Sequence, residues 1–245
     1  MERHDAALVL TLLPHGEHGA VVRFLGLREG LVAAYVHGAR SRARRADLAP
    51  GNRVRLVLRG RLRERLPTAT LEVEASRALL AFDPAPAAAL AYLVELLAGA
   101  LPEGEPDPAL AERFDALLDR MTGGGDWPAA MVRFERDLLS ALGFGLDLGV
   151  CALSGRRDGL AFVSPRSGRA VSAAAAEGQP WARRLLPLPG FLCEAEAEGM
   201  PAPDAEACAA GFALTGHFLA RHVFPERPRA EALRREALAR MGLSA

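Results

Sequence analysis

The chain has 245 residues, half of them hydrophobic, and its 30 arginines balance its 30 acidic residues, so the formal net charge is zero. No uninterrupted apolar run reaches the length of about 18 residues that a transmembrane helix needs, so none is predicted. Lysine is absent, which excludes chemistry that needs a phosphate-loop or Schiff-base lysine. Cys151, Cys193 and Cys208 are too few and too far apart for a disulfide framework, and they favour a reducing cytoplasm.

The neutral total hides an uneven distribution of charge. Residues 1–80 carry 14 arginines against 8 acidic residues, and the remainder of the chain carries 16 against 22. A basic first part followed by an acidic remainder favours a polyanionic partner for the first part. The alternative is an ordinary small basic domain, because such domains are common.

The first 80 residues contain five short runs rich in β-branched and aliphatic side chains, separated by turn-forming segments. We expect these runs to form strands at 6–13, 20–27, 31–38, 53–60 and 69–75. Five strands with one longer connection after the third predict a small closed barrel of the oligonucleotide-binding (OB) type. An SH3-like barrel fits the strand count almost as well.

The longer connection, within YVHGARSRARRADLAPG at 35–51, is rich in arginine and is expected to be a surface loop. In the following run, arginines alternate with Val54, Leu56 and Leu58, so the strand presents one apolar and one cationic face. Loop and strand together predict a DNA-binding surface, the alternative being a solvated charge run. Its expected members are Arg40, Arg42, Arg44, Arg45, Arg53, Arg55, Arg59, Arg61, Arg63 and Arg65.

Aromatic residues are scarce beside these arginines. Phe24 and Tyr35 are the only Phe, Tyr or Trp residues before residue 80. Because single-strand binding normally adds base stacking to phosphate contacts, we expect binding dominated by the backbone, sensitive to salt and with little recognition of bases.

Beyond residue 83 the pattern becomes helical. Prolines suited to a first turn open helical patterns at 84–101, 108–121 and 128–145. Two further helices are expected at 204–224 and 229–241. Between these two groups lies an irregular segment with short β signals at 160–163 and 169–171.

Signatures of catalysis are weak. His217 and His222 are five apart on a predicted helix and do not share a face well, so a metal pair is not favoured. Glu135 is expected to solvate an exposed helix face. The segment SPRSG at 164–168 could bind phosphate through Arg166, or could simply be a tight turn. The sequence predicts no enzyme and no cofactor, and an enzyme that uses the histidines or this loop is the alternative.

Three pieces of the sequence, HGAR with its basic continuation, LLSALGFGLDL and FVSPRSG, occur in an order that resembles the RecO family of bacterial DNA repair proteins over almost the whole chain. The resemblance implies an α+β multidomain fold. Its expected parts are an OB-fold β-barrel at 1–80, the first part of an α-helical domain at 81–149, a degenerate zinc-ribbon-like insertion at 150–180 and the C-terminal helices that complete the helical domain at 181–245.

The resemblance also implies a cytoplasmic, nucleoid-associated recombination mediator with no chemistry of its own and no membrane. Such a protein binds single- and double-stranded DNA and anneals complementary strands. With RecR it helps to load RecA onto strands coated by single-stranded DNA-binding protein. An RNA-binding or ribosome-associated OB-fold protein is the alternative, because phosphate contacts alone do not distinguish the two polymers.

The implied contact with the acidic tail of single-stranded DNA-binding protein needs an apolar pocket flanked by arginine. Arg133 and Arg136, three apart on one predicted helix, are the candidates, unless they merely solvate that helix.

The insertion departs from the family members that carry four zinc-binding cysteines. Cys151 is the only cysteine of 150–180, and Ser154 stands at the second position of the expected C-x-x-C. Tetrahedral zinc needs four good ligands, so we expect no bound metal. Apolar contacts among Leu160, Phe162 and Val171 are expected to hold the ribbon instead.

Overall fold

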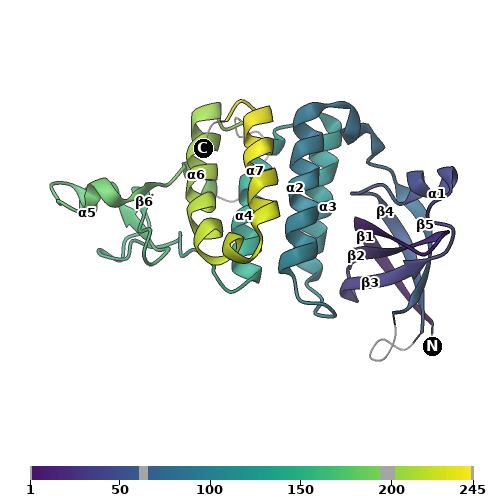
Figure 1. Ribbon diagram of the computed structural model, residues 1–245. Helices are drawn as coiled ribbons and strands as arrows, with labels where there is room; N and C mark the ends of the chain where they lie inside the picture. The colour runs from purple at the N-terminus through teal and green to yellow at the C-terminus, as the bar shows by residue number, and fades with distance from the viewer. Residues whose placement is uncertain (1, 61–65, 194–201, 244–245) are drawn as a thin grey trace. The chain divides into compact units, whose positions relative to one another are not determined.

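The computed structural model describes residues 2–60, 66–193 and 202–243 (Figure 1). The chain divides into two compact units. The first consists of Met1–Gly125 and Arg229–Met241, and the second of Asp126–Pro228 and Gly242–Ala245. Each unit is therefore made of two separate stretches of sequence, and a helix near the C-terminus belongs to the first unit.

The first unit begins with a five-stranded closed barrel, whose strand order is β1-β2-β3-β5-β4. Neighbouring strands are antiparallel except β3 and β5, whose parallel pairing closes the barrel. Phe24, Leu56 and Leu58 are fully buried in its apolar core. The prediction of five strands is confirmed, with bounds β1 (Glu2–His15), β2 (Gly19–Gly26), β3 (Gly30–Val36), β4 (Arg53–Arg59) and β5 (Thr68–Ala75).

The arginine-rich connection is not the loop that the sequence suggested, because its centre forms a short helix, α1 (Arg42–Asp47). The Ser41 hydroxyl accepts a hydrogen bond from the backbone N–H of Arg44 at 3.3 Å and caps the helix. Ala39 before the helix and Leu48 after it are buried in the barrel core. These two anchors and the cap hold the segment in one conformation, which the polar composition did not reveal.

Three helices and a short 3₁₀ turn complete the first unit. Two of these helices open with proline, as the sequence predicted, and Asp83 and Asp107 cap them. α2 packs against β1, and α3 packs against β2. The bounds are η1 (Ala78–Phe82), α2 (Pro84–Ala100), α3 (Pro108–Gly123) and α7 (Pro228–Arg240).

The second unit pairs two helices, α4 (Trp127–Ala141) and α6 (Ala205–His222). Their close approach depends on Gly211, because a Cβ there would lie 2.8 Å from a Val132 methyl group. Among the described residues of the whole chain, no helix is long and apolar enough to cross a membrane.

A small three-stranded sheet of order β7-β6-β8 forms the ribbon of the second unit. Both β signals of the sequence are confirmed, whereas β8 is two residues long and was not foreseen. The bounds are β6 (Leu160–Val163), β7 (Ala170–Ser172), α5 (Ala173–Ala176), η2 (Ala182–Arg184), β8 (Leu186–Pro187), η3 (Gly190–Leu192) and η4 (Phe224–Glu226). With a five-stranded sheet followed by a helical region, the fold is α+β, as expected.

Candidate nucleic-acid interface

The arginines of α1 differ in how far they are neutralised. Arg42 and Arg45 are exposed, and among the described residues neither has a polar partner for its side chain. Arg44 lies 3.4 Å from the Asp47 carboxylate on the same helix. Arg40, just before the helix, donates to the backbone carbonyl of Glu17 at 3.0 Å, an acceptor that leaves its charge uncompensated. The helix thus presents cations that remain available to an external anion.

The predicted alternation along β4 is confirmed, since Val54, Leu56 and Leu58 are buried and the arginines lie on the opposite face. These arginines are paired with acidic side chains. Arg55 lies 3.2 Å from Glu72 and 3.3 Å from Glu74 on β5. Their expected contact with DNA therefore stays a prediction, because a phosphate would have to compete with carboxylates already in place.

The two ends of β4 show the same pairing. Arg59 lies 3.1 Å from Glu2 on β1, and Arg53 lies 2.7 Å from Asp115 on α3. The hydrogen bond and the charge of Asp115 raise the pKa of Arg53. The remaining predicted members, Arg61, Arg63 and Arg65, lie outside the described residues, so their contact with DNA also stays a prediction.

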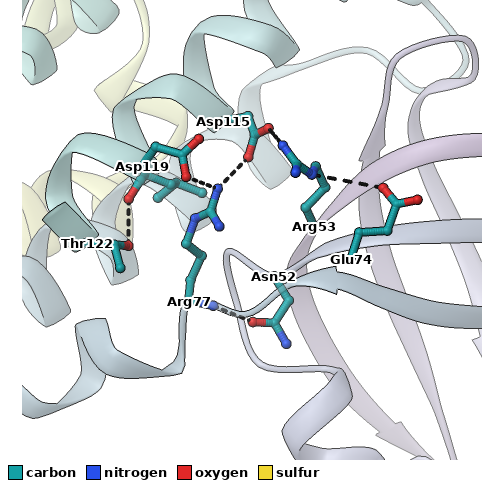
Figure 2. A network of polar contacts seen from close by, with 8 residues as sticks. Asn52, Arg53, Glu74, Arg77, Asp115, Asp119 and Thr122 are labelled. Carbon is teal, nitrogen blue, oxygen red and sulfur yellow. Dashed lines mark hydrogen bonds and ion pairs between the residues drawn. The ribbon is translucent and has the colours of Figure 1, made fainter.

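Figure 2 shows the polar network around Arg77, which joins the residues at the start of β4 to α3. Arg77 is almost fully buried and lies 2.8 Å from Asp115 and 2.7 Å from Asp119. Its backbone N–H donates to the side-chain oxygen of Asn52 at 2.8 Å. The amide nitrogen of Asn52 donates in turn to the carbonyls of Ala46 and Asp47, at 2.9 and 3.0 Å. The buried Asn52 therefore ties the C-terminal end of α1 to the network.

Sequence reasoning missed a cluster of aromatic rings on the barrel. The ring of Tyr35 lies edge-to-face with His37, at 4.7 Å between centroids, and with His15, at 6.0 Å. The two histidines were overlooked because only Phe, Tyr and Trp were counted as aromatic residues. Part of the signal was present in the sequence, because Tyr35 and His37 have the i, i+2 spacing of side chains on one face of an extended segment.

The predicted tail-binding arginines on α4 are engaged within the second unit. Arg133 donates to the carbonyl of Phe191 at 3.2 Å, and its guanidinium lies 5.1 Å from the centre of the Phe191 ring. Arg136 donates to the carbonyl of Leu192 at 3.0 Å and pairs with Asp137 at 2.8 Å. Both side chains hold the segment at η3, and their role toward a partner stays a prediction.

The ribbon is organised around the sulfur of Cys151. This sulfur accepts hydrogen bonds from the backbone N–H groups of Ser154 at 3.5 Å and Ser172 at 3.3 Å, and the Ser172 hydroxyl lies 3.5 Å away. Burial disfavours the thiolate, but these hydrogen bonds outweigh it and lower the pKa of Cys151 to about 6. Val171 is buried beside it, with Leu160 and Phe162 packed against the cluster as expected.

The donor set of the ribbon does not fit zinc. Cys151 is its only thiol, whereas a structural zinc site is closed by four Cys or His ligands. Among the described residues, no group of three or more His, Cys, Asp or Glu is placed to hold a metal ion.

The alternative catalytic groups serve internal contacts in the second unit. His217 lies 3.1 Å from the carbonyl of Pro165, and Arg221 donates to the same oxygen at 3.1 Å, so α6 holds the SPRSG turn. Glu135 is fully buried and accepts a hydrogen bond from the Thr215 hydroxyl. The expectation that Glu135 solvates an exposed face was wrong, because α6 packs over that face of α4.

The geometry defines a class of protein in which a small, closed β-barrel bearing exposed arginines precedes a helical region. Two family descriptions match the chain. "Recombination protein O N terminal" matches residues 1–77, and "Recombination protein O C terminal" matches residues 81–231. The chain belongs to the RecO family of DNA repair and recombination proteins, which confirms the resemblance seen in the sequence.

Curated relatives support the same assignment over nearly full length. The DNA repair protein RecO of Phenylobacterium zucineum is 47% identical over 225 residues, which cover 91% of this chain and 90% of the relative. That of Paracoccus denitrificans is 46% identical over 219 residues, covering 89% and 86%. That of Methylobacterium nodulans is 43% identical over 244 residues, covering 99% and 98%. The protein therefore has a role in DNA repair and recombination.

Proposed function

We propose that this protein is a recombination mediator that binds single- and double-stranded DNA through an OB-type barrel and anneals complementary strands. With RecR it helps to load RecA onto strands coated by single-stranded DNA-binding protein, and it catalyses no reaction of its own. The single observation that carries DNA binding is the availability of Arg42 and Arg45, which extend from a capped and anchored helix without a carboxylate partner among the described residues. Such guanidinium groups can pair with phosphate oxygens without first giving up another anion.

The arginines of β4 extend this surface with a smaller expected contribution. Arg55 and Arg59 are exposed and lie on the outer face of the barrel, which supports their inclusion. Each guanidinium group must break its ion pair with a carboxylate before it binds a phosphate. The lost ion pair cancels part of the binding free energy that the phosphate contributes. Arg40 and Arg44, whose partners are backbone carbonyls or one half-buried carboxylate, are expected to contribute between these two groups.

The test is to replace Arg42 and Arg45 together by alanine and to measure binding of a single-stranded oligonucleotide across a series of salt concentrations. Loss of two phosphate contacts lowers the salt slope by about 1.4 and weakens binding at low salt. The matched control is Arg183→Ala with Arg184→Ala, which removes the same charge from an exposed pair in the second unit. An unchanged slope in the α1 variant, or an equal loss in the control, would contradict the proposal.

Annealing of complementary strands, followed with and without single-stranded DNA-binding protein, tests the mediator role. We expect the wild type to anneal both naked and coated strands, and the α1 double variant to lose both activities in parallel. Competition by RNA of equal length at fixed salt distinguishes the polymers. If RNA displaced DNA at equal or lower concentration, the RNA-binding alternative would replace the proposal.

We keep Arg133 and Arg136 as the proposed receptors for the terminal carboxylate of the partner's acidic tail. The support is that Arg133 lies over the ring of Phe191, so a cation borders an apolar side chain there. The test compares a tail peptide ending in a free carboxylate with the same peptide ending in an amide. Loss of a charge-assisted pair weakens the amide peptide about ten-fold. Arg133→Lys, which keeps the charge but not the planar fork, is expected to bind the two peptides more nearly alike.

A further inference from the structure

The outer face of the barrel carries an aromatic cluster that phosphate binding alone does not explain. His15 and His37 are exposed, and Tyr35 lies half-buried between them with its ring nearly perpendicular to both, at 83° and 85°. Edge-to-face contacts of this kind hold rings in fixed orientations. The two outer rings are thereby presented to solvent beside the half-buried Tyr35 ring.

The position of Tyr35 depends on a glycine in the neighbouring strand. A Cβ at Gly19 would lie 2.0 Å from the Tyr35 hydroxyl oxygen and 2.2 Å from the adjoining ring carbon. Gly19 has an ordinary backbone conformation, so the missing side chain serves space and not flexibility. The absence of a side chain at Gly19 on β2 therefore leaves room for the Tyr35 ring to lie across the strand.

A cationic hollow of about 300 Å³ adjoins this cluster. His37 lines the hollow and also contacts Tyr35, so the two features are continuous. Strand register explains the continuity, because Tyr35 on β3 pairs with Thr68 on β5, and Thr68 pairs with Arg59 on β4. The polar groups that line the hollow are His37, Arg44, Arg59, Thr68 and Thr70.

The charges around the hollow are mostly exposed. Arg44 lies 3.4 Å from Asp47 and donates weakly to the carbonyl of Leu71 at 3.5 Å, and Arg59 lies 3.1 Å from Glu2. Both acidic partners are themselves partly solvated, so these ion pairs are weak and can be exchanged. The hollow can therefore accept an anion between two guanidinium groups.

We propose that the rings of His15, Tyr35 and His37 and the adjoining hollow form one nucleotide-binding subsite for single-stranded nucleic acid. A base stacks on the exposed histidine rings, and its phosphate enters the hollow between Arg44 and Arg59. This inference rests on the proposed DNA-binding function and deepens it, because a duplex keeps its bases stacked and cannot use the rings. It adds to the expectation of binding dominated by the backbone a base contact that raises affinity without sequence readout.

The test uses two oligonucleotides with the same number of phosphates, oligothymidylate and a fully abasic strand. The wild type is expected to bind the abasic strand about ten-fold more weakly at fixed salt, since stacking of one base contributes that much. His37→Ala, a change of an exposed side chain, is expected to remove most of this difference by weakening oligothymidylate only. His37→Phe is expected to retain it. The matched control is His4→Ala, an exposed histidine of β1 outside the cluster.

The outcomes separate the subsite from the function on which it rests. If the wild type bound both strands equally, or if His37→Ala and His4→Ala behaved alike, DNA binding would stand and the subsite would be refuted. If the wild type bound neither strand, the DNA-binding function itself would fail, and the subsite with it. Gly19→Ala gives a second check, because moving the Tyr35 ring should lower the preference for bases while leaving the abasic strand unaffected.

Discussion

The barrel of the first unit and the ribbon of the second unit are both small β structures, but they are held together in different ways. The barrel closes around a continuous apolar core in which Phe24 and Leu56 are fully buried. The ribbon cluster is smaller: it buries Cys151, Val171 and Ala176, with partly buried side chains such as Leu160 and Phe162 packed against them. The barrel therefore has a large apolar core, whereas the ribbon combines a smaller apolar cluster with hydrogen bonds to the Cys151 sulfur.

Two turns of the ribbon are joined by polar contacts whose spacing is close to that of two thiolates on one zinc ion. The Cys151 sulfur accepts from the N–H group three residues later, and the Ser172 hydroxyl does the same with Ala175 at 3.4 Å. The Ser172 hydroxyl also donates to the Cys151 sulfur at 3.5 Å. Two thiolates on one tetrahedral zinc ion, each about 2.3 Å from the metal, lie roughly 3.8 Å apart. These hydrogen bonds join the two turns through the Cys151 sulfur and the Ser172 hydroxyl.

The largest expected effect comes from adding a zinc site to the ribbon. Ser154→Cys, Ser172→Cys and Ala175→Cys together complete a four-thiolate set with Cys151. The triple variant is expected to bind one zinc ion tightly, since structural sites of this type contribute about 10–16 kcal/mol in small domains. Elemental analysis of the purified protein and the thiolate absorption of its cobalt form provide the measurement.

A control for this variant carries three cysteines that do not converge, at Ala152, Ser164 and Ala174. It is expected to bind no stoichiometric metal, as is the wild type. Stoichiometric zinc in the wild type, or equal metal content in the two triple variants, would show that the comparison of the turns with a metal site is wrong.

The second prediction compares how much an aromatic ring stabilises the barrel and the ribbon. Phe24→Ala is expected to destabilise the barrel by about 3–5 kcal/mol, because a fully buried ring leaves a cavity. Phe162→Ala removes a ring that is only partly buried, and should cost about 1 kcal/mol. Amide hydrogen exchange read separately in the barrel and the ribbon gives both values. A larger loss in the ribbon than in the barrel would reverse the comparison.

The first unit also has a buried polar network, in which Arg77, just after β5, pairs with two carboxylates of α3 (Figure 2). Arg77→Met is expected to lower the free energy of unfolding by about 3 kcal/mol, because Asp115 loses a buried partner. Urea unfolding followed by circular dichroism measures the loss. Arg53→Met is the control, since that side chain is more exposed and Arg77 remains on the same carboxylate, so a smaller loss is expected. If the two variants lost equal stability, burial of Arg77 would not be the cause.

Sequence reasoning succeeded where the pattern is local. The strands, the alternation along β4 and the proline-opened helices follow from spacing within one segment. It failed where partners come from distant segments. The carboxylates that pair with Arg55 belong to the next strand, and Asp115 lies on a helix far along the chain. The Tyr35 cluster likewise depends on a glycine in another strand, which no periodicity reveals.

The smallest expected effect concerns the paired arginines on the outside of the barrel. Glu72→Gln with Glu74→Gln leaves Arg55 without its two carboxylates and should change stability by less than about 1 kcal/mol. If β4 contacts DNA, affinity for single strands rises a few-fold and the salt slope steepens by about 0.7 for each phosphate gained. The control, Glu105→Gln with Glu112→Gln, makes the same charge change on exposed residues of the first unit that lie outside the barrel strands and, within the described part of the chain, form no ion pair with a β4 arginine. Equal gains from the two pairs would mean that only net charge matters and that β4 lies outside the interface. A gain confined to the first pair would place the strand arginines beside those of α1, with their carboxylates limiting how tightly the barrel holds DNA.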